Sequence, residues 1–234
     1  DAISNYNLLE FDDTFEYAGV NPCAEEPLPA GGSCLLSSIN LSAFVKDKEF
    51  DFDDFGETVA NGVIYLNEVL EEGLSLHPLE EQRQSVADWR QIGLGIMGLA
   101  DMLIKMELPY DSEQARHLCE KIGLVMADQA LYTSAFLAGH AGSYNNYKSC
   151  VQKSEFLKNN TCESTREAIE AYGLRNSQLL TIAPTGTIST MLGISGGIEP
   201  IFANSYTRKT ESLHGHDEYY KVYTPIVKEY MDEH

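Results

Sequence analysis

The chain has 234 residues, enough for one large domain or two small ones with a sizeable core. Aspartate and glutamate outnumber lysine and arginine by 36 to 16, and this negative charge disfavours binding to nucleic acid polymers or to anionic membranes. No apolar run of about 18 residues occurs, so we expect no segment to span a membrane.

The cysteines indicate a reducing compartment. The sequence holds five, at positions 23, 34, 119, 150 and 162. An odd number with irregular spacing does not suit a secreted disulfide framework, and no basic-then-apolar leader is seen, so we expect a cytoplasmic protein. No spacing suits zinc, and His214 and His216 are interpreted as solvated loop residues, so no metal site is expected. The chain starts with aspartate and its first motif follows almost at once, so we expect a piece of a longer protein.

The first ninety residues favour a loop, a strand and two helices, in that order. Gly, Pro and Ser dominate residues 22–38, which predicts a long loop with turns. Residues 38–45 (SINLSAFV) alternate in polarity as a strand entering a core does. Apolar residues recur at helical spacing over 52–73, with aspartates in the first turn, and a second helix is predicted over 79–89.

The segment RQIGLGIMGLADMLIKM (90–106) contains three glycines, Gly93, Gly95 and Gly98, that spell GxGxxG. A dinucleotide-binding turn would need a strand before this motif, a helix after it and an acidic residue on a second strand. The preceding residues look helical, and no later strand carries an acid. We therefore predict a helix whose glycines permit close packing, in preference to a nucleotide-binding turn.

The second half favours helices. The clearest spans 110–139, where Ser112 can act as the cap and an apolar stripe follows. A shorter helix over 162–173 ends at a glycine. The tail, 217–234, is predicted to be an amphipathic helix with a break at Pro225.

A different pattern appears where a short apolar strand, 179–183, runs into the sequence PTGTIST. A strand that leads into a loop of threonine, glycine and serine can present backbone N–H groups to a phosphate, and a following helix adds its dipole. No GK[ST] occurs, so this is not a Walker loop. The alternative is a capped helix start without a ligand.

The stretch GVNPCAEEPL (19–28) carries the chemistry. A thiol becomes a nucleophile as the thiolate, yet no His or Lys lies near Cys23 in sequence and Glu25 opposes ionisation. A neutral thiol suits hydrogen-atom chemistry, because a thiyl radical forms by loss of a hydrogen atom. In an extended backbone Asn21, Cys23 and Glu25 project to one side, as an amide, a thiol and a carboxylate base, with Cys34 as a second thiol. A cysteine hydrolase with a base distant in sequence is the alternative.

Four motifs occur in order between residues 17 and 210: NPCAEEPLPAGGSCLLSSINL, RQIGLGIMGLADML, LPYDSEQA and LLTIAPTGTISTMLGISGGIEPIF. Together they resemble the large catalytic subunit of ribonucleotide reductase, and NPC and SGGIEP are most similar to its adenosylcobalamin-dependent branch. The resemblance implies an α/β fold that is part of a ten-stranded α/β barrel, with the radical cysteine on an internal loop. Residues 1–234 would then be a partial catalytic barrel domain, with upstream and downstream parts absent.

The resemblance also implies residue roles in reducing ribonucleotides to 2′-deoxyribonucleotides, the precursors of DNA. Cys23 resembles the thiyl-radical residue that removes the 3′-hydrogen of the ribose, Glu25 the base for the 3′-hydroxyl, and Asn21 the amide that binds the substrate hydroxyls. Cys34 is similar to one of two thiols that deliver reducing equivalents and end as a disulfide. The substrate's phosphates are implied to bind the loop made of Pro184, Thr185, Gly186, Thr187, Ile188 and Ser189.

The implied cofactor is adenosylcobalamin, whose binding residues are not identified in this chain. The alternative is the metal-dependent branch, in which a separate subunit with a di-metal centre and a tyrosyl radical replaces cobalamin. A thioredoxin- or glutaredoxin-like reductant and a homodimer are implied for the full-length enzyme. The family's second redox cysteine, effector region and cysteine tail are not found here, so we expect this chain alone not to reduce nucleotides.

A nucleotide-binding module that has kept the fold and lost catalysis is an alternative from another class. The presence of Asn21, Cys23 and Glu25 together argues against it, because a binding module has no need for the thiol.

Overall fold

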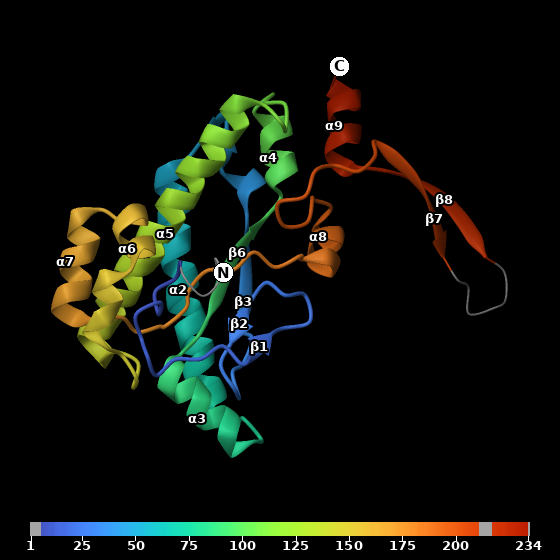
Figure 1. The fold of residues 1–234 in the computed structure, drawn as a ribbon. Helices are drawn as coiled ribbons and strands as arrows, with labels where there is room; N and C mark the ends of the chain where they lie inside the picture. The colour runs from blue at the N-terminus through green and yellow to red at the C-terminus, as the bar shows by residue number, and fades with distance from the viewer. Residues whose placement is uncertain (1–5, 211–216, 234) are drawn as a thin grey trace.

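The computed structural model describes residues 6–210 and 217–233. At its centre, β3 (Leu36–Asn40) pairs in parallel with β6 (Gly93–Met97) (Figure 1). All five residues of β6 are buried. Burial on both faces is typical of a strand inside a parallel sheet, where a neighbouring layer covers each side.

A third segment, residues 178–181, lies along the other edge of β6. The N–H of Leu94 donates to the carbonyl of Leu179 at 2.8 Å, and the N–H of Thr181 donates to the carbonyl of Leu94 at 3.1 Å. Leu94 and Leu180 form an isolated parallel bridge. The strand predicted over 179–183 is therefore present only as this short extended run beside β6.

The helices connect these segments and cover one side of them. Figure 1 shows α2 and α5 beside the β3–β6 pair, with α6 and α7 farther out. In the described part of the chain no helix combines the length and apolarity needed to cross a bilayer. The helices, including two short 3-10 helices labelled η, are η1 (Leu41–Phe44), α2 (Phe52–Leu74), α3 (Glu80–Trp89), α4 (Leu99–Lys105), α5 (Glu113–Ala141), η2 (Ser149–Lys153), α6 (Glu155–Asn160), α7 (Glu163–Tyr172), α8 (Gly186–Leu192) and α9 (Pro225–Glu233).

Local signals explain the long helices. The side chain of Asp51 caps α2 by accepting the N–H of Asp54, and Ser112 caps α5 by accepting the N–H of Ala115 at 3.1 Å. Gly173 follows α7 with a positive φ of 75°. The helices predicted over 52–73, 79–89, 110–139 and 162–173 are confirmed to within a few residues.

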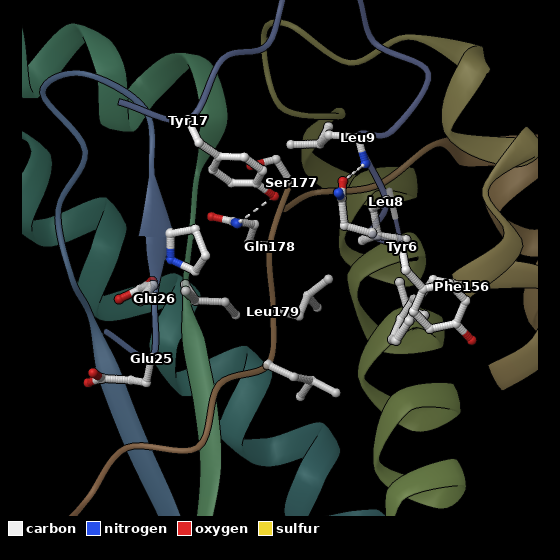
Figure 2. A pocket seen from close by; sticks show the side chains of 15 residues that line it. Tyr6, Leu8, Leu9, Tyr17, Glu25, Glu26, Phe156, Ser177, Gln178 and Leu179 are labelled. Atoms are coloured by element: carbon white, nitrogen blue, oxygen red, sulfur yellow. Dashed lines mark hydrogen bonds between the residues drawn. The ribbon is translucent and has the colours of Figure 1, made fainter. Parts of the chain in front are cut away.

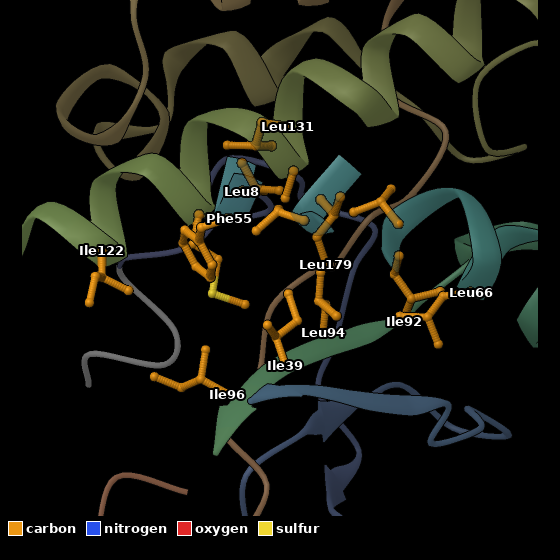
Figure 3. Packing of buried hydrophobic residues seen from close by; sticks show 14 of the residues in the cluster. Leu8, Ile39, Phe55, Leu66, Ile92, Leu94, Ile96, Ile122, Leu131 and Leu179 are labelled. Atoms are coloured by element: carbon orange, nitrogen blue, oxygen red, sulfur yellow. The ribbon is translucent and has the colours of Figure 1, made fainter. Parts of the chain in front are cut away.

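The core forms where these helices meet the strands (Figure 3). Phe55 and Leu66 of α2 and Leu131 of α5 are almost fully buried, as is Leu94 of β6. Burying one such side chain stabilises the fold by roughly 1.5–3 kcal/mol. One face of β6 thereby becomes anchored to the helical layer.

A buried polar network holds the start of the third segment. Asn176 is fully buried, and its side chain exchanges two hydrogen bonds of 3.0 Å with that of Asn67 on α2. It also donates to the carbonyl of Arg90 at 2.8 Å and accepts from Ser134 of α5 at 3.1 Å. Because buried polar groups are costly when unpaired, this network fixes where residues 178–181 enter the sheet.

The single helix predicted over 90–106 is wrong in its first half, where β6 occupies 93–97 and only α4 is helical. Gly93 and Gly95 are strand residues, so the motif is not a dinucleotide-binding turn either. Gly98 precedes α4 with a left-handed φ of 73°. A short buried apolar run does not distinguish a strand from a helix by its period, and here the parallel neighbours decide.

Two other expectations need correction. The strand predicted over 38–45 begins at Leu36 and stops at Asn40, because the Asn40 side chain caps η1 by accepting the N–H of Ser42. In the tail, α9 is helical as predicted, but residues 218–223 form a strand.

That strand is β8 (Glu218–Tyr223), which pairs antiparallel with β7 (Ser205–Thr210). Tyrosine and valine favour strands when such a partner is present. His214 and His216 lie outside the described residues. The remaining short strands are β1 (Gly19–Val20), β2 (Pro27–Leu28), β4 (Val45–Lys46) and β5 (Glu49–Phe50).

Candidate active site

The predicted catalytic residues lie on and beside the tip of the small hairpin formed by β1 and β2. Asn21 closes the loop between the two strands. Its N–H donates to the carbonyl of Glu26 at 3.2 Å, and its side-chain Oδ1 accepts the N–H of Glu26 at 2.9 Å. The oxygen side of the Asn21 amide is therefore used to hold the loop, and Nδ2 is its donor end.

The backbone turns at the cysteine. The N–H of Ala24 donates to the carbonyl of Asn21 at 2.9 Å, which makes residues 21–24 a turn with Pro22 in its second position, where proline is favoured. Ala24 has a φ of 63°, which is uncommon for alanine. The turns predicted over 22–38 are therefore present, but the extended arrangement considered for residues 21–25 is not, because the proline and the closed hairpin impose a turn. Cys23 lies in this turn and is exposed.

Cys34 lies beside the loop. Its Sγ is 3.8 Å from Nδ2 of Asn21, a long contact in which the amide donates weakly to sulfur. Partial burial, the neighbouring Glu26 carboxylate and the charges of Glu25 and Cys23 raise the pKa of Cys34 to about 12. Although Cys34 is exposed enough to be reached from solvent, its sulfur is protonated at neutral pH.

Two consecutive glutamates follow the turn. The carbonyl of Glu25 accepts a hydrogen bond of 2.6 Å from Oγ1 of Thr181, which ties the loop to the third parallel segment. Glu25 is half-buried, and its Oε2 receives no hydrogen bond from a described residue. Glu26 is only 3% exposed, and burial raises the pKa of its carboxyl group. The candidate site therefore holds two carboxyl groups, and that of Glu26 is the more deeply buried.

A hollow of about 200 Å³ opens beside these glutamates (Figure 2). Its walls are mainly apolar, and Gln178 donates to the hydroxyl of Tyr17 across it at 3.4 Å. Figure 2 shows Glu25 and Glu26 on one side, with their carboxylates directed away from Phe156 on the other. Of the predicted site residues, only Glu25 lines this hollow. The two thiols lie elsewhere, around the turn.

The predicted phosphate loop follows the third segment. Thr185 has a positive φ of 52° and precedes α8, and its Oγ1 accepts the N–H of Gly197 at 2.9 Å. The expected helix start is therefore present. The first N–H groups of any helix lack an intrahelical partner, so those of Gly186, Thr187 and Ile188 are the donors that a phosphate would find here.

Thr181 and Glu26 are the site residues that the sequence analysis missed. A Cβ built on Gly95 would lie 2.2 Å from the carbonyl oxygen of Thr181. Glycine in β6 thus lets Thr181 approach closely enough to hold Glu25. Two glycines at alternate positions in an apolar run, Gly93 and Gly95, are a sequence signal for such a close approach within a strand.

The chain was compared with known protein families. The family model described as "Ribonucleotide reductase, barrel domain" matches residues 5–233. This chain belongs to that family. In the described part of this ribonucleotide reductase domain, β3, β6 and residues 178–181 form an open parallel array, and no closed barrel is seen.

Individual ribonucleotide reductases are similar over most of the chain. A protein of Thermoplasma acidophilum named "Vitamin B12-dependent ribonucleoside-diphosphate reductase" is 40% identical over 80% of this chain and 22% of its own length. One of the same name from Mycobacterium tuberculosis is 34% identical over 83% of this chain and 25% of its own. The "Ribonucleoside-diphosphate reductase large chain" of Encephalitozoon cuniculi is 35% identical over 82% of this chain and 27% of its own length. The chain thus spans about a quarter of the length of these relatives.

The described residues do not by themselves fit adenosylcobalamin. Two hollows found among them hold about 200 and 380 Å³. Drug-sized ligands already need pockets of about 300–1,000 Å³, and a corrin with its adenosyl and nucleotide arms is much larger. Within the part of the chain that the structure describes, no group of three His, Cys, Asp or Glu side chains gathers as metal ligands do.

Proposed function

We propose that this chain carries the radical site of a ribonucleotide reductase, which reduces ribonucleotides to 2′-deoxyribonucleotides through a thiyl radical. The observation that carries the proposal is the gathering of Asn21, Cys23 and Glu25 in one hairpin loop with Cys34 beside it, Asn21 Nδ2 being 3.8 Å from Cys34 Sγ. Membership of the reductase family supports it. The chain would be part of the catalytic barrel of a longer enzyme.

Cys23 begins and ends the reaction in this proposal. As a thiyl radical it takes the hydrogen atom from C3′ of the ribose, so that its S–H bond forms as the C–H bond breaks. At the end it returns a hydrogen atom to C3′. Its exposure at the turn makes the sulfur accessible both to the substrate and to the group that generates the radical.

Glu25 and Asn21 act on the sugar hydroxyls. Glu25 takes the proton of the 3′-hydroxyl, which helps the protonated 2′-hydroxyl leave as water. Nδ2 of Asn21 donates to a substrate hydroxyl, since its Oδ1 is already occupied by the N–H of Glu26. Hydrogen bonds that hold both hydroxyls would orient C3′ toward Cys23.

Cys34 and a second thiol supply the two electrons. Each loses one hydrogen, and the two sulfurs join in a disulfide, so that a ribonucleotide and two thiols give a deoxyribonucleotide, water and a disulfide. The protonated state of Cys34 at neutral pH supports this role, because a thiol carries the hydrogen that a thiolate lacks. A thioredoxin- or glutaredoxin-like protein would reduce the disulfide again.

The loop formed by residues 184–189 would hold the substrate's phosphates through backbone N–H groups. Thr181 supports this arrangement, because it precedes the loop in the chain and its hydroxyl donates a hydrogen bond to the carbonyl of Glu25. One short connection thus links the residues proposed for the phosphates to those proposed for the ribose.

The role of Glu25 can be tested by changing it to glutamine, which keeps its shape and removes the base. In the intact enzyme that contains this chain, we expect Glu25→Gln to lower kcat by about 10²–10⁴-fold, with a much smaller change in substrate Kd. Single-turnover kinetics and equilibrium binding would measure the two effects. A variant that keeps wild-type kcat would refute the role of Glu25 as base.

The radical source is a separate question. Two of the relatives are named vitamin B12-dependent, which favours adenosylcobalamin over a separate di-metal tyrosyl-radical subunit. Parts of the enzyme outside the described residues would have to complete a cobalamin site. Electron paramagnetic resonance of the full-length protein distinguishes the sources: a radical signal that needs added adenosylcobalamin supports the first, and a tyrosyl signal from a second subunit supports the other.

A further inference from the structure

We propose that Asp101 is a positioning residue for residues 184–189, the loop proposed to bind the substrate's phosphates, and that it acts through Ser195. The inference rests on the proposed function and adds a residue that this function does not use. Asp101 belongs to the first turn of α4, far from the loop in sequence.

Ser195 is joined to the start of α4 through each of its polar groups. Its N–H donates to Oδ2 of Asp101 at 2.7 Å, and its Oγ accepts the N–H of Ala100 at 3.2 Å. Its carbonyl accepts the N–H of Gly98 at 2.8 Å. The first N–H groups of a helix lack intrahelical partners, and the N-cap of α4 is Gly98, which has no side chain to supply one. Ser195 therefore caps α4 from a distant segment.

Asp101 is the side chain that fixes the backbone of Ser195 in this arrangement. An acidic residue at the third helical position commonly bonds back to the N–H of the N-cap residue. Here the N–H of Gly98 is taken by the carbonyl of Ser195, and the Asp101 carboxyl group accepts the N–H of Ser195 instead. Asp101 is only 2% exposed, so its removal would leave a buried N–H without a partner, which is costly.

The segment that contains Ser195 is bonded to the proposed phosphate loop on both sides of that serine. On one side, the N–H of Ile194 donates to the carbonyl of Ser189 at 3.0 Å. On the other side, the N–H of Gly197 donates to Oγ1 of Thr185 at 2.9 Å. A shift of Ser195 would therefore be passed to both ends of the loop.

The loop depends on this support. After α8, the chain runs back toward the start of α4 and passes close to the loop (Figure 1). A Cβ built on Gly196 would lie 2.8 Å from the carbonyl oxygen of Pro184, so the two backbones are in close approach. Thr185 has a left-handed φ of 52°, a conformation that persists only where the surrounding structure holds it.

The expected consequence concerns the affinity for phosphate. Backbone N–H groups bind a phosphate only while they point toward it, and the apparent Kd rises as the fraction of molecules in that arrangement falls. Cys23 and Glu25 lie on a different loop, so the loss of Asp101 should weaken the binding of the phosphates more than that of the ribose.

The test is equilibrium binding to the intact enzyme that contains this chain, with a ribonucleoside diphosphate and with the same ribonucleoside lacking phosphates. We expect Asp101→Ala to raise the Kd of the diphosphate about tenfold or more and to change that of the ribonucleoside by less than about twofold. Asp101→Asn keeps an oxygen that can accept the N–H of Ser195, so its Kd for the diphosphate should stay within about threefold of the wild-type value. A merely structural role would raise both Kd values equally in Asp101→Ala, and that result overturns the proposal.

Thr187→Glu tests the proposed phosphate loop directly, because Thr187 is exposed in it and a carboxylate there would repel a phosphate. Weaker diphosphate binding in Thr187→Glu but not in Asp101→Ala overturns the role of Asp101 and leaves the phosphate loop supported. Unchanged binding in both variants overturns both assignments. If Asp101→Ala does not fold, Ser195→Ala decides, since it removes only the bond to Ala100: a Kd raised for the diphosphate alone supports the proposal, and an unchanged Kd overturns it.

Discussion

Changing Cys23 to serine in the intact enzyme is expected to abolish ribonucleotide reduction, lowering kcat by roughly four orders of magnitude or more, with substrate Kd unchanged within about twofold. Serine is close to cysteine in shape, but its O–H bond is too strong to yield the radical. Because Cys23 is an exposed turn residue, the substitution should leave the loop intact. Turnover with a radiolabelled ribonucleotide and equilibrium binding would measure the two quantities.

The matched control is Cys162→Ser, which changes another exposed cysteine at the first residue before α7. Serine is favoured at that position, so we expect the fold and the turnover to be retained. Wild-type turnover by the Cys23→Ser enzyme would end the radical assignment, as would an equal loss of turnover in both variants.

The second large effect is expected from Gly95→Ala. The new Cβ would lie 2.2 Å from the carbonyl oxygen of Thr181. Because that oxygen belongs to the backbone, a side-chain rotation cannot relieve the clash. Either the third parallel segment leaves β6 or the strand distorts. We expect the free energy of unfolding to fall by about 3 kcal/mol or more, measured by urea denaturation followed through Trp89, the single tryptophan.

Gly123→Ala serves as the control for this prediction. Gly123 is exposed on α5, and a Cβ there would meet nothing within 4 Å. Alanine should stabilise the helix by up to about 1 kcal/mol. Equal effects of the two substitutions would contradict the close approach of Thr181 to β6. In the intact enzyme, Gly95→Ala should also lower turnover, because Thr181 holds the loop at Glu25.

Elements with local signals were predictable from the sequence. The helices α2 and α5 have apolar residues at helical spacing and a capping side chain before the first turn, so their positions depend little on the rest of the chain. The hairpin loop was recognised by its residue types, because an asparagine, a thiol and a carboxylate in one short motif indicate a chemistry before any geometry is known.

Other features depend on contacts between distant residues. β6 was predicted to be helical, and it is a strand because β3 and residues 178–181 supply its hydrogen-bond partners from 57 and more than 80 residues away. A loop with turns was predicted around Cys23, but its closure by Asn21 and its link to Thr181 are not visible in the residue pattern.

The sequence by itself determined the family, the long helices and the residues that bear the proposed chemistry, because these rest on residue identity and local spacing. Only the tertiary structure decided which of two adjacent glutamates is buried, and how the loop is tied to the sheet. The reason is physical: burial and close backbone approach are properties of packing between segments, and neighbouring residues of the same type carry no local signal that separates them.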